Sequence, residues 1–536
     1  MNEPAELVLV GTPAAPGLAH GVVHILSGRR PLYASLGVEG DREALTDAIA
    51  TASAGLGALI AEADDDDAAG MLTFQLAMLE DETLTEPAFA GIAGGAAADQ
   101  AWVAALAELI ADFAASDDAN FAARAADLID LRDRVLDALC GPAGGLDDLP
   151  AGAILVSDDL TPSRFLEVDW SRAAGMALRA GSRASHVAIL ARGRGIPMVV
   201  GLGDAITVNA GGADAWLDAD QGRLIVRPAA ETRATLARRH SDATQAQLVA
   251  DSFRDLPAVT RGGRAVTVYV NLDDPDRAPG LQPVSCDGVG LARSEFLFER
   301  PDGGLPDEAQ QFAAYAKLLR WADGRPVTIR TLDAGGDKPI AGLTDDREAN
   351  PFLGLRGLRL SLARPDVFAV QARALLRAAT VGRLKVMLPM VTAPHEIAAA
   401  RAVFFDELGA LNRSGTPAAM PALGMMVEVP AAALAIADFD VDFYSIGTND
   451  LIQYVCAVGR DNDRVAALYD PTHPAVLRCL AMVAAHGARV GREVSLCGDM
   501  ASDPAHTRAL LECGIHVLSV TPAAIARVKQ AVAALD

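Results

Sequence analysis

Apolar residues recur at several different spacings along this chain, and each spacing predicts a different kind of element. Residues 5–26 have the alternating pattern of two short strands around a turn at 13–17. From residue 40 to about 139, Ala and Leu repeat at helical spacing with few Gly or Pro, which predicts an inserted helical region. Strand-like runs return between 152 and 228 and predict a compact α/β domain. Residues 229–253 contain no Gly or Pro and predict a helical connector.

The remainder of the chain, from residue 262 onward, alternates strand-like runs with Ala- and Leu-rich helical pieces. Eight such units are the pattern of a (β/α)8 barrel. The eight runs are VTVYVN (266–271), GVGLAR (288–293), VTIRTLD (327–333), KVMLPM (385–390), LGMMVEV (423–429), DFYSIGT (442–448), VSLCGD (494–499) and HVLSVT (516–521).

The pattern as a whole predicts a multidomain α/β protein. We expect residues 1–30 and 145–228 to form the α/β domain and residues 31–144 to form a helical subdomain inserted into it. Residues 229–256 are expected to be a helical linker, and residues 257–536 the C-terminal (β/α)8 barrel of the TIM type.

Reactive side chains gather at the carboxyl ends of the predicted barrel strands. That end of a (β/α)8 barrel is where its active site lies. A surface ion pair would explain any one of these residues, but it explains the joint placement poorly. The set comprises Asn271, Arg293, Arg330, Asp333, Glu428, Asn449, Asp450, Cys497 and Asp499.

The side chains at this predicted rim offer three kinds of chemistry. Arginines can bind a small, multiply charged anion through paired hydrogen bonds; the candidates are Arg293, Arg330, Arg356 and Arg460. Glu428 and Asp450 supply carboxylate oxygens suited to Mg²⁺, which keeps several waters and bridges to substrate oxygens. Cys497 is a thiol that could donate a proton. A small phosphorylated acid bound through a metal ion is the expected substrate.

A second candidate site lies in the segment GSRASHVAILARGRGIPMVVG, residues 181–201. Ser185 is a plausible N-cap, and Gly193, Gly195 and Pro197 would end the helix after about two turns. His186 would then lie in the first turn, where the helix dipole opposes protonation of the imidazole and attracts anions. That position suits a nucleophile that becomes phosphorylated, although a lone His at a helix start is more often a structural hydrogen bonder.

Composition narrows the range of partners and compartments. Lys plus Arg number 46 against 70 Asp plus Glu, and the net charge of −24 argues against nucleic acid or an anionic membrane as the main partner. The chain has no run of 18 uncharged apolar residues and no signal-peptide pattern at its N-terminus, so we expect a cytoplasmic location. Its six cysteines form no CxxC pair and are expected to be reduced thiols.

Several motifs resemble those of enzyme I of the bacterial phosphoenolpyruvate-dependent sugar phosphotransferase system. The segment around His186 resembles the phosphohistidine signature that enzyme I shares with pyruvate phosphate dikinase and phosphoenolpyruvate synthase. The barrel motifs GVGLARSEFLF, TIRTLDAGGDK, NPFLGLRGLRL, GMMVEVPAA, FYSIGTND and LCGDMASD are similar to the phosphoenolpyruvate-binding barrel of enzyme I. The resemblance covers nearly the whole chain in family order.

The resemblance implies a phosphoenolpyruvate-protein phosphotransferase in which His186 is phosphorylated and passes the group to a histidine of the HPr carrier protein. It implies that phosphoenolpyruvate is bound at Arg293, Arg330, Asn449, Asp450 and Arg460, that Glu428 and Asp450 hold Mg²⁺, and that Cys497 protonates the leaving enolate. Supporting roles would fall to Thr161, Arg356, Asp333 and Lys338. A homodimer through the barrel is also expected.

The helical insertion resembles the subdomain of enzyme I on which HPr docks. The similar stretches are residues 74–84 and 121–136, and Arg124, Asp127 and Asp130 are candidates for the docking surface. Because His186 would have to visit both the barrel and the carrier, we expect the first 228 residues to swivel on the linker.

The sequence departs from the family pattern at a few positions near the predicted sites. Ser182 and Ala184 stand where Gly and Thr are usual, Gly459 and Asp461 flank Arg460 in exchanged order, and Asp499 and Ser502 replace Glu and Gly. These departures keep open a catalytically weakened relative that senses phosphoenolpyruvate or binds a partner. A dikinase or synthase would need an ATP-binding module, for which we find neither the length nor a Gly-rich phosphate loop.

Overall fold

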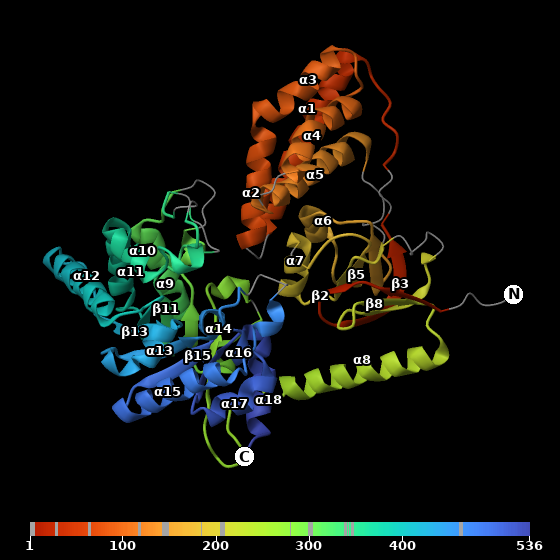
Figure 1. Cartoon of the computed structure of the whole chain (residues 1–536). Coiled ribbons are helices and arrows are strands. Elements are labelled where there is room, and N and C mark those ends of the chain that lie inside the picture. Colours follow the sequence, from red (N-terminus) through yellow and green to blue (C-terminus); the bar gives the residue numbers. More distant parts are fainter. Residues whose placement is uncertain are drawn as a thin grey trace. The chain divides into compact units, whose positions relative to one another are not determined.

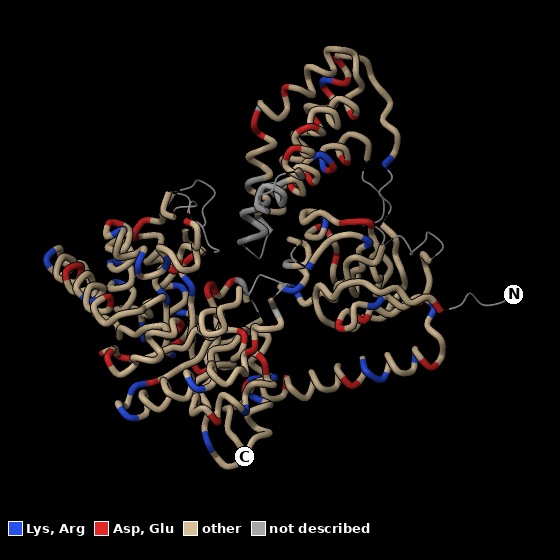
Figure 2. The backbone as a smooth tube through the Cα atoms, viewed as in Figure 1, with Lys and Arg blue, Asp and Glu red and all other residues tan. Residues whose placement is uncertain are grey.

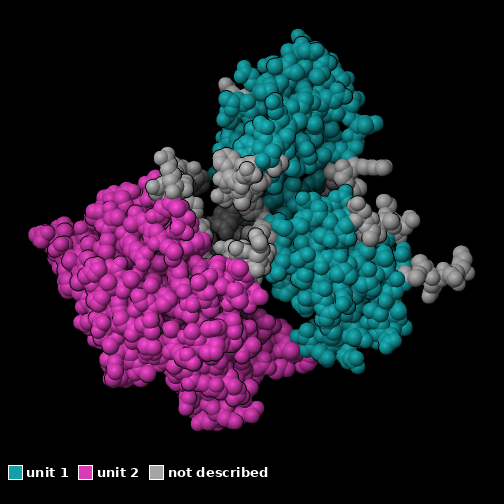
Figure 3. All heavy atoms as spheres, in the orientation of Figure 1, with its two compact units in different colours: residues 1–244 teal, residues 245–536 magenta. Residues whose placement is uncertain are grey.

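A computed structural model of the chain divides it into two compact units, residues 1–244 and 245–536 (Figure 3). Within the described part, none of the helices combines the length and the apolar character that crossing a bilayer requires. The structure describes residues 6–26, 30–62, 66–115, 119–141, 149–183, 185–203, 210–278, 280–298, 304–336, 340, 342–344, 348–459 and 465–536.

An eight-stranded mixed sheet forms the centre of the α/β domain, with the strand order β1-β8-β7-β3-β4-β5-β6-β2 (Figure 1). Strands β3 to β6 pair in parallel, and the strands toward both edges pair antiparallel. The strands are β1 (Leu7–Val10), β2 (Thr12–Ala15), β3 (Leu18–Ile25), β4 (Ala153–Ser157), β5 (Ala173–Leu178), β6 (Met198–Val200), β7 (Asp214–Asp218) and β8 (Arg223–Val226). Two short helices, α6 (Pro162–Glu167) and α7 (His186–Arg194), complete the domain.

The N-terminal segment differs from the expectation of two strands around a turn at 13–17, because β2 takes up most of that turn. Pro13 lies inside β2, which is the last strand of the sheet and pairs only with β6. An edge strand tolerates a proline, since one side of its backbone needs no partner. The pattern of apolar residues also missed β7, which begins and ends with Asp.

Five helices form the inserted subdomain and enclose their own hydrophobic core (Figure 1). The core is built around the fully buried Trp102, whose indole N–H donates to the carbonyl of Arg132 at 3.1 Å. The expected helical character of this region is confirmed. The helices are α1 (Val38–Glu62), α2 (Asp66–Glu80), α3 (Glu82–Ala93), α4 (Ala98–Ala114) and α5 (Ala119–Cys140).

Helix α8 (Ala230–Asp251) follows β8, the last strand of the α/β domain, and precedes the barrel strands in the chain. Its first half is held on that domain by ion pairs from Arg233 to Asp214 and from Arg239 to Asp218. Residues 241–249 are exposed, and charges of both signs lie along the helix (Figure 2). This helix coincides closely with the segment in which the sequence lacks Gly and Pro.

The C-terminal unit contains a closed, all-parallel barrel with the strand order β10-β11-β12-β13-β14-β15-β16-β9. All eight strand-like runs of the sequence form barrel strands, which confirms the predicted fold class. The strands are β9 (Thr267–Asn271), β10 (Val289–Ala292), β11 (Val327–Arg330), β12 (Leu384–Leu388), β13 (Ala422–Val427), β14 (Phe443–Gly447), β15 (Glu493–Cys497) and β16 (Val517–Val520).

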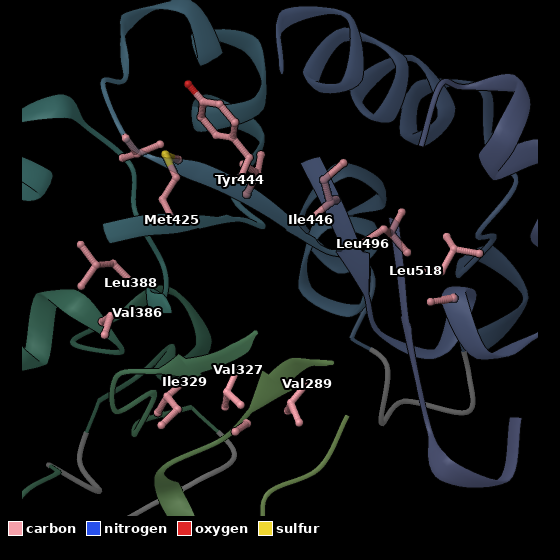
Figure 4. Close-up of a cluster of buried hydrophobic side chains, with 14 of the residues drawn as sticks. Val289, Val327, Ile329, Val386, Leu388, Met425, Tyr444, Ile446, Leu496 and Leu518 are labelled. Atoms are coloured by element: carbon pink, nitrogen blue, oxygen red, sulfur yellow. The ribbon is translucent and has the colours of Figure 1, made fainter. Parts of the chain in front are cut away.

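Helices surround this barrel and are joined to it by one large hydrophobic core. Side chains such as Val327, Leu388 and Ile446 point from the strands into this layer (Figure 4). A separate small cluster holds Met387, Met426, Phe443 and Cys497. The helices are α9 (Glu308–Trp321), α10 (Leu358–Ala363), α11 (Pro365–Ala378), α12 (Pro394–Arg413), α13 (Pro430–Leu434), α14 (Thr448–Cys456), α15 (Pro474–Val490), α16 (Asp499–Ser502), α17 (Thr507–Glu512) and α18 (Ile525–Ala533).

Candidate active site

Arg330 is the last residue of β11 and lies buried at the carboxyl end of the barrel. Its guanidinium is 2.9 Å from the Asp333 carboxylate and 3.2 Å from the Glu295 carboxylate. Neither Nε nor Nη2 of Arg330 makes a hydrogen bond with good geometry to the part of the chain that the structure describes. Buried donors of this kind cost free energy unless an acceptor meets them, and an arginine at this end of a barrel has the chemistry to bind an anion.

Arg356 binds two carboxylates, those of Asp333 and Asp450, near the same carboxyl end of the barrel. It is almost fully buried, and it donates to both oxygens of Asp333 at 3.1 Å and to both oxygens of Asp450 at 3.0 and 3.2 Å. These neighbouring carboxylates raise the pKa of Arg356 against the opposing effect of burial, so the guanidinium stays charged. The sequence predicted Arg356 and Asp333 at the site, and the structure brings them together.

Glu428 and Asp450 supply the two carboxylates expected to bind a metal ion. Glu428 is buried and accepts the backbone N–H of Met390 at 2.6 Å. Burial, together with the nearby negative charges of Asp333 and Asp450, raises the pKa of Glu428 above its ordinary value. A divalent cation would offset this concentration of negative charge, and two carboxylates are enough for an ion that also binds waters and substrate. No group of three His, Cys, Asp or Glu residues gathered for a metal occurs among the described residues.

Arg293 follows β10 and is more exposed than the other two arginines. Its backbone N–H and its guanidinium both bond Asp273, at 2.7 and 2.9 Å, in the segment that follows β9. The charge of Asp273 raises the pKa of Arg293. The side chain is 55% exposed, which leaves part of the guanidinium open to a ligand.

Cys497 ends β15 and is buried in the small cluster that it shares with Met387, Met426 and Phe443. Its sulfur lies 3.5 Å from the carbonyl of Ile446 and 3.8 Å from the hydroxyl of Ser445. Burial raises the pKa of the thiol to about 11, so the sulfur carries its proton at neutral pH. A protonated thiol is the form that a general acid requires.

Helix α7 begins at His186, and its N-cap is Ser185, as the sequence predicted. The Ser185 hydroxyl accepts the N–H of Ala188 at 3.3 Å, and the helix ends at Gly195 in a left-handed conformation with φ of 67°. Thr161 caps α6 in the same domain, and its buried hydroxyl has no hydrogen-bond partner within the described chain. The side chain of His186 lies outside the described structure, as do Lys338 and Arg460.

The acidic candidates for the carrier-docking surface are not on the surface, and that prediction was wrong. Asp127 and Asp130 on α5 are buried. Asp130 accepts the Nε2 of Gln75 at 3.1 Å and the hydroxyl of Ser163 on α6 at 2.6 Å. It therefore joins the helical subdomain to the α/β domain. The side chain of Arg124 lies outside the described structure.

Sequence reasoning missed two acids that hold the rim arginines in place. Glu295 pairs with Arg330 and also accepts the backbone N–H of Asp333 at 2.7 Å. Asp273 holds Arg293. Each follows the end of a barrel strand within three residues, which is the signal that could have identified them.

Family models of the PEP-utilising enzymes match all three parts of the chain, namely the barrel, the α/β domain and the inserted helices. The PEP-binding domain of these enzymes matches residues 248–536, their mobile domain matches residues 149–222, and their N-terminal domain matches residues 10–124. This is the class of protein that the fold and the site define.

Proteins with similar sequences narrow this class of PEP-utilising enzymes further. The phosphoenolpyruvate-protein phosphotransferase of Cupriavidus necator is 36% identical, over 97% of this chain and 93% of that protein. The enzyme of the same name from Geobacillus stearothermophilus is 39% identical, over 78% of this chain and 72% of that protein. A multiphosphoryl transfer protein of Xanthomonas campestris is 37% identical over 98% of this chain, which spans 63% of that longer protein. The chain therefore belongs to the phosphoenolpyruvate-protein phosphotransferase family, which confirms the resemblance to enzyme I.

Proposed function

We propose that this protein transfers the phosphoryl group of phosphoenolpyruvate to His186 and from there to a histidine of an HPr-type carrier, as the first step of sugar uptake. The observation that carries the proposal is the buried Arg330 at the carboxyl end of a barrel of this family, where its Nη2 forms an ion pair with Glu295 and its Nε makes no hydrogen bond to the described chain. The family match spans both the barrel and the domain that contains His186.

In this proposal the barrel residues bind phosphoenolpyruvate and receive the enolate. Arg293 and Arg330 neutralise the negative charge of the phosphoryl oxygens and the carboxylate. Neutral His186 attacks phosphorus, so an N–P bond forms while the bond between phosphorus and the enol oxygen breaks. The resulting enolate takes a proton from the Cys497 thiol at its methylene carbon to give pyruvate, and the thiolate regains a proton from solvent.

The proposal includes a divalent cation, which this family requires, and we assign it as Mg²⁺. Glu428 and Asp450 would hold the ion, because their buried carboxylates are the hard oxygen ligands that Mg²⁺ prefers. When bound, the cation would neutralise charge on the phosphoryl and carboxylate oxygens of the substrate. Arg356 would keep the Asp450 carboxylate oriented through its two hydrogen bonds.

The partners and location are part of the same proposal. The carrier would dock on the helical subdomain. Because Asp127 and Asp130 are buried, other residues of this subdomain would contact the carrier. We also propose a homodimer through the barrel and a cytoplasmic location. The swivelling of His186 between barrel and carrier about α8 belongs to this proposal as well.

The test is incubation of the full chain with radiolabelled phosphoenolpyruvate and Mg²⁺. We expect acid-labile label on the wild type and on His395→Ala, an exposed histidine on α12, and none on His186→Ala. Absence of label on the wild type would favour a regulator that binds phosphoenolpyruvate without using it. Label that appears only with ATP would instead identify a dikinase or synthase.

A further inference from the structure

Helices α14 and α16, which begin just after strands β14 and β15 at the barrel rim, are hydrogen-bonded to each other in their first turns. Strands β14 and β15 are parallel, and Gly447 lies opposite Cys497 in their register. Asn449 and Asp499 each follow two residues later, so they reach the same level of the rim. The N–H of Asp499 donates to Asn449 Oδ1 at 3.0 Å, and Asn449 Nδ2 donates to the Asp499 carboxylate at 3.3 Å.

We call this contact the amide clasp; it comprises Thr448, Asn449, Gly498 and Asp499. The backbone at Gly498 has the conformation that allows it. Gly498 has a φ of 102°, and a Cβ there would lie 2.3 Å from the Thr448 hydroxyl and 2.7 Å from Asn449 Oδ1. Only glycine permits that approach. The Thr448 hydroxyl at the start of α14 donates to the carbonyl of Cys497 at the end of β15 at 2.8 Å, which adds a third bond between the two segments.

The clasp fixes which atoms of Asn449 can face a ligand. A backbone N–H can only donate, so the amide atom that it bonds must be the oxygen. The nitrogen then has two hydrogens, one of which is directed at the Asp499 carboxylate. The other is the group that remains for a bound anion. The carboxylate of Asp499 would itself repel an anion, so it acts through Asn449 and not by touching substrate.

We propose that Asp499 is a positioning residue that holds the amide of Asn449 with its remaining N–H directed at the anionic substrate in the barrel. Cys497 and Asp499 are separated only by Gly498, so the same clasp also ties this amide to the segment that contains Cys497. The group that binds substrate and the group that donates the proton then keep a fixed spacing. This inference rests on the proposed function of the barrel, and it assigns a task to a residue at which the chain departs from the enzyme I pattern.

The test is a double-mutant cycle in the full chain, with Asp499→Ala, Asn449→Ala and the double variant. The backbone N–H of residue 499 remains in all of them. We expect Asp499→Ala to lower kcat/KM for phosphoenolpyruvate-dependent labelling about tenfold, mainly through KM, and to change it less than about twofold when Asn449 is already Ala. Asp499→Asn keeps an acceptor oxygen and should restore most of the activity. The control Glu512→Gln removes an exposed charge on α17 and should leave kcat/KM unchanged.

Two further measurements separate this inference from its alternatives. The rate of phosphoryl transfer from phosphorylated His186 to the carrier should be the same in all variants, because this step does not use the barrel site. The dissociation constant of phosphoenolpyruvate with Mg²⁺ should show the same coupling, and it can be measured even if the protein never becomes labelled. Additive effects of the two substitutions would overturn the positioning role. Absence of labelling with coupled binding would instead refute the proposed transfer and leave the clasp intact.

Discussion

Cys497 shows how the barrel controls a single reactive group. Its thiol lies among Met387, Met426 and Phe443, and this apolar surrounding disfavours the thiolate. The neighbouring carbonyl of Ile446 can accept the S–H but cannot stabilise a negative sulfur. The residue is therefore suited to donate a proton and unsuited to act as a nucleophile at neutral pH.

The raised pKa of Cys497 predicts a specific pH dependence of its chemical reactivity. Because the pKa is about 11, only about one thiol in a thousand is ionised at pH 8, and the alkylation rate should rise about tenfold per pH unit between pH 8 and about pH 10. Iodoacetamide labelling followed by peptide mass spectrometry would measure this rate. The same cysteine in denatured protein should level off near pH 9. A native rate that levels off below pH 9 would contradict the assignment.

At the scale of residues, the sequence predicted which side chains lie at the ends of the barrel strands better than it predicted their partners. Arg330, Glu428 and Cys497 were found because each ends or follows a strand of the barrel, and that rule is local. Asp127 was misjudged because its burial depends on contacts between segments far apart in the chain. Glu295 follows a strand in the same way as the predicted residues and was missed because its partner, Arg330, belongs to a different strand. A charged residue on a helical pattern carries no local sign of whether its face meets solvent or another helix.

At the scale of elements, α5 shows how a helix can join two domains through one buried acid. Asp130 on α5 accepts both the backbone N–H and the hydroxyl of Ser163 at the start of α6. It also accepts Gln75 from α2. The Asp130 carboxylate thus links α2, α5 and α6, because its oxygens accept hydrogen bonds from protein groups instead of water.

Substitution of Asp130 should act on stability and not directly on carrier binding. Asp130→Ala would leave the buried N–H and hydroxyl of Ser163 without their acceptor and Gln75 with only its longer bond to Asp127, at a cost of roughly 3 kcal/mol. Scanning calorimetry of the full chain should show a lower transition temperature for the N-terminal unit and an unchanged transition for the barrel. The control Glu108→Ala, on the exposed face of α4, should change neither. Weaker carrier binding with an unchanged transition would show that Asp130 contacts the carrier.

At the scale of the whole molecule, the proposed chemistry is divided between the two compact units. His186 belongs to residues 1–244, while the carboxylates and arginines of the rim belong to residues 245–536. The strand and helix periods predicted the elements within each unit, because each element buries one face in its own core. The swivelling proposed about α8 stays a prediction, and the structure adds that residues 241–249 of this helix are exposed.

This division predicts that removal of divalent metal will block one half-reaction and spare the other. Excess EDTA should abolish labelling of His186 by phosphoenolpyruvate, because Glu428 and Asp450 would then face the substrate's negative charge without a cation. Transfer from phosphorylated His186 to the carrier uses none of the barrel carboxylates, so it should proceed at the same rate in EDTA. Glu428→Gln with Mg²⁺ present should reproduce the first effect and not the second. If EDTA slowed both half-reactions equally, the metal would act outside the barrel, and the assignment of Glu428 and Asp450 as its ligands would fail.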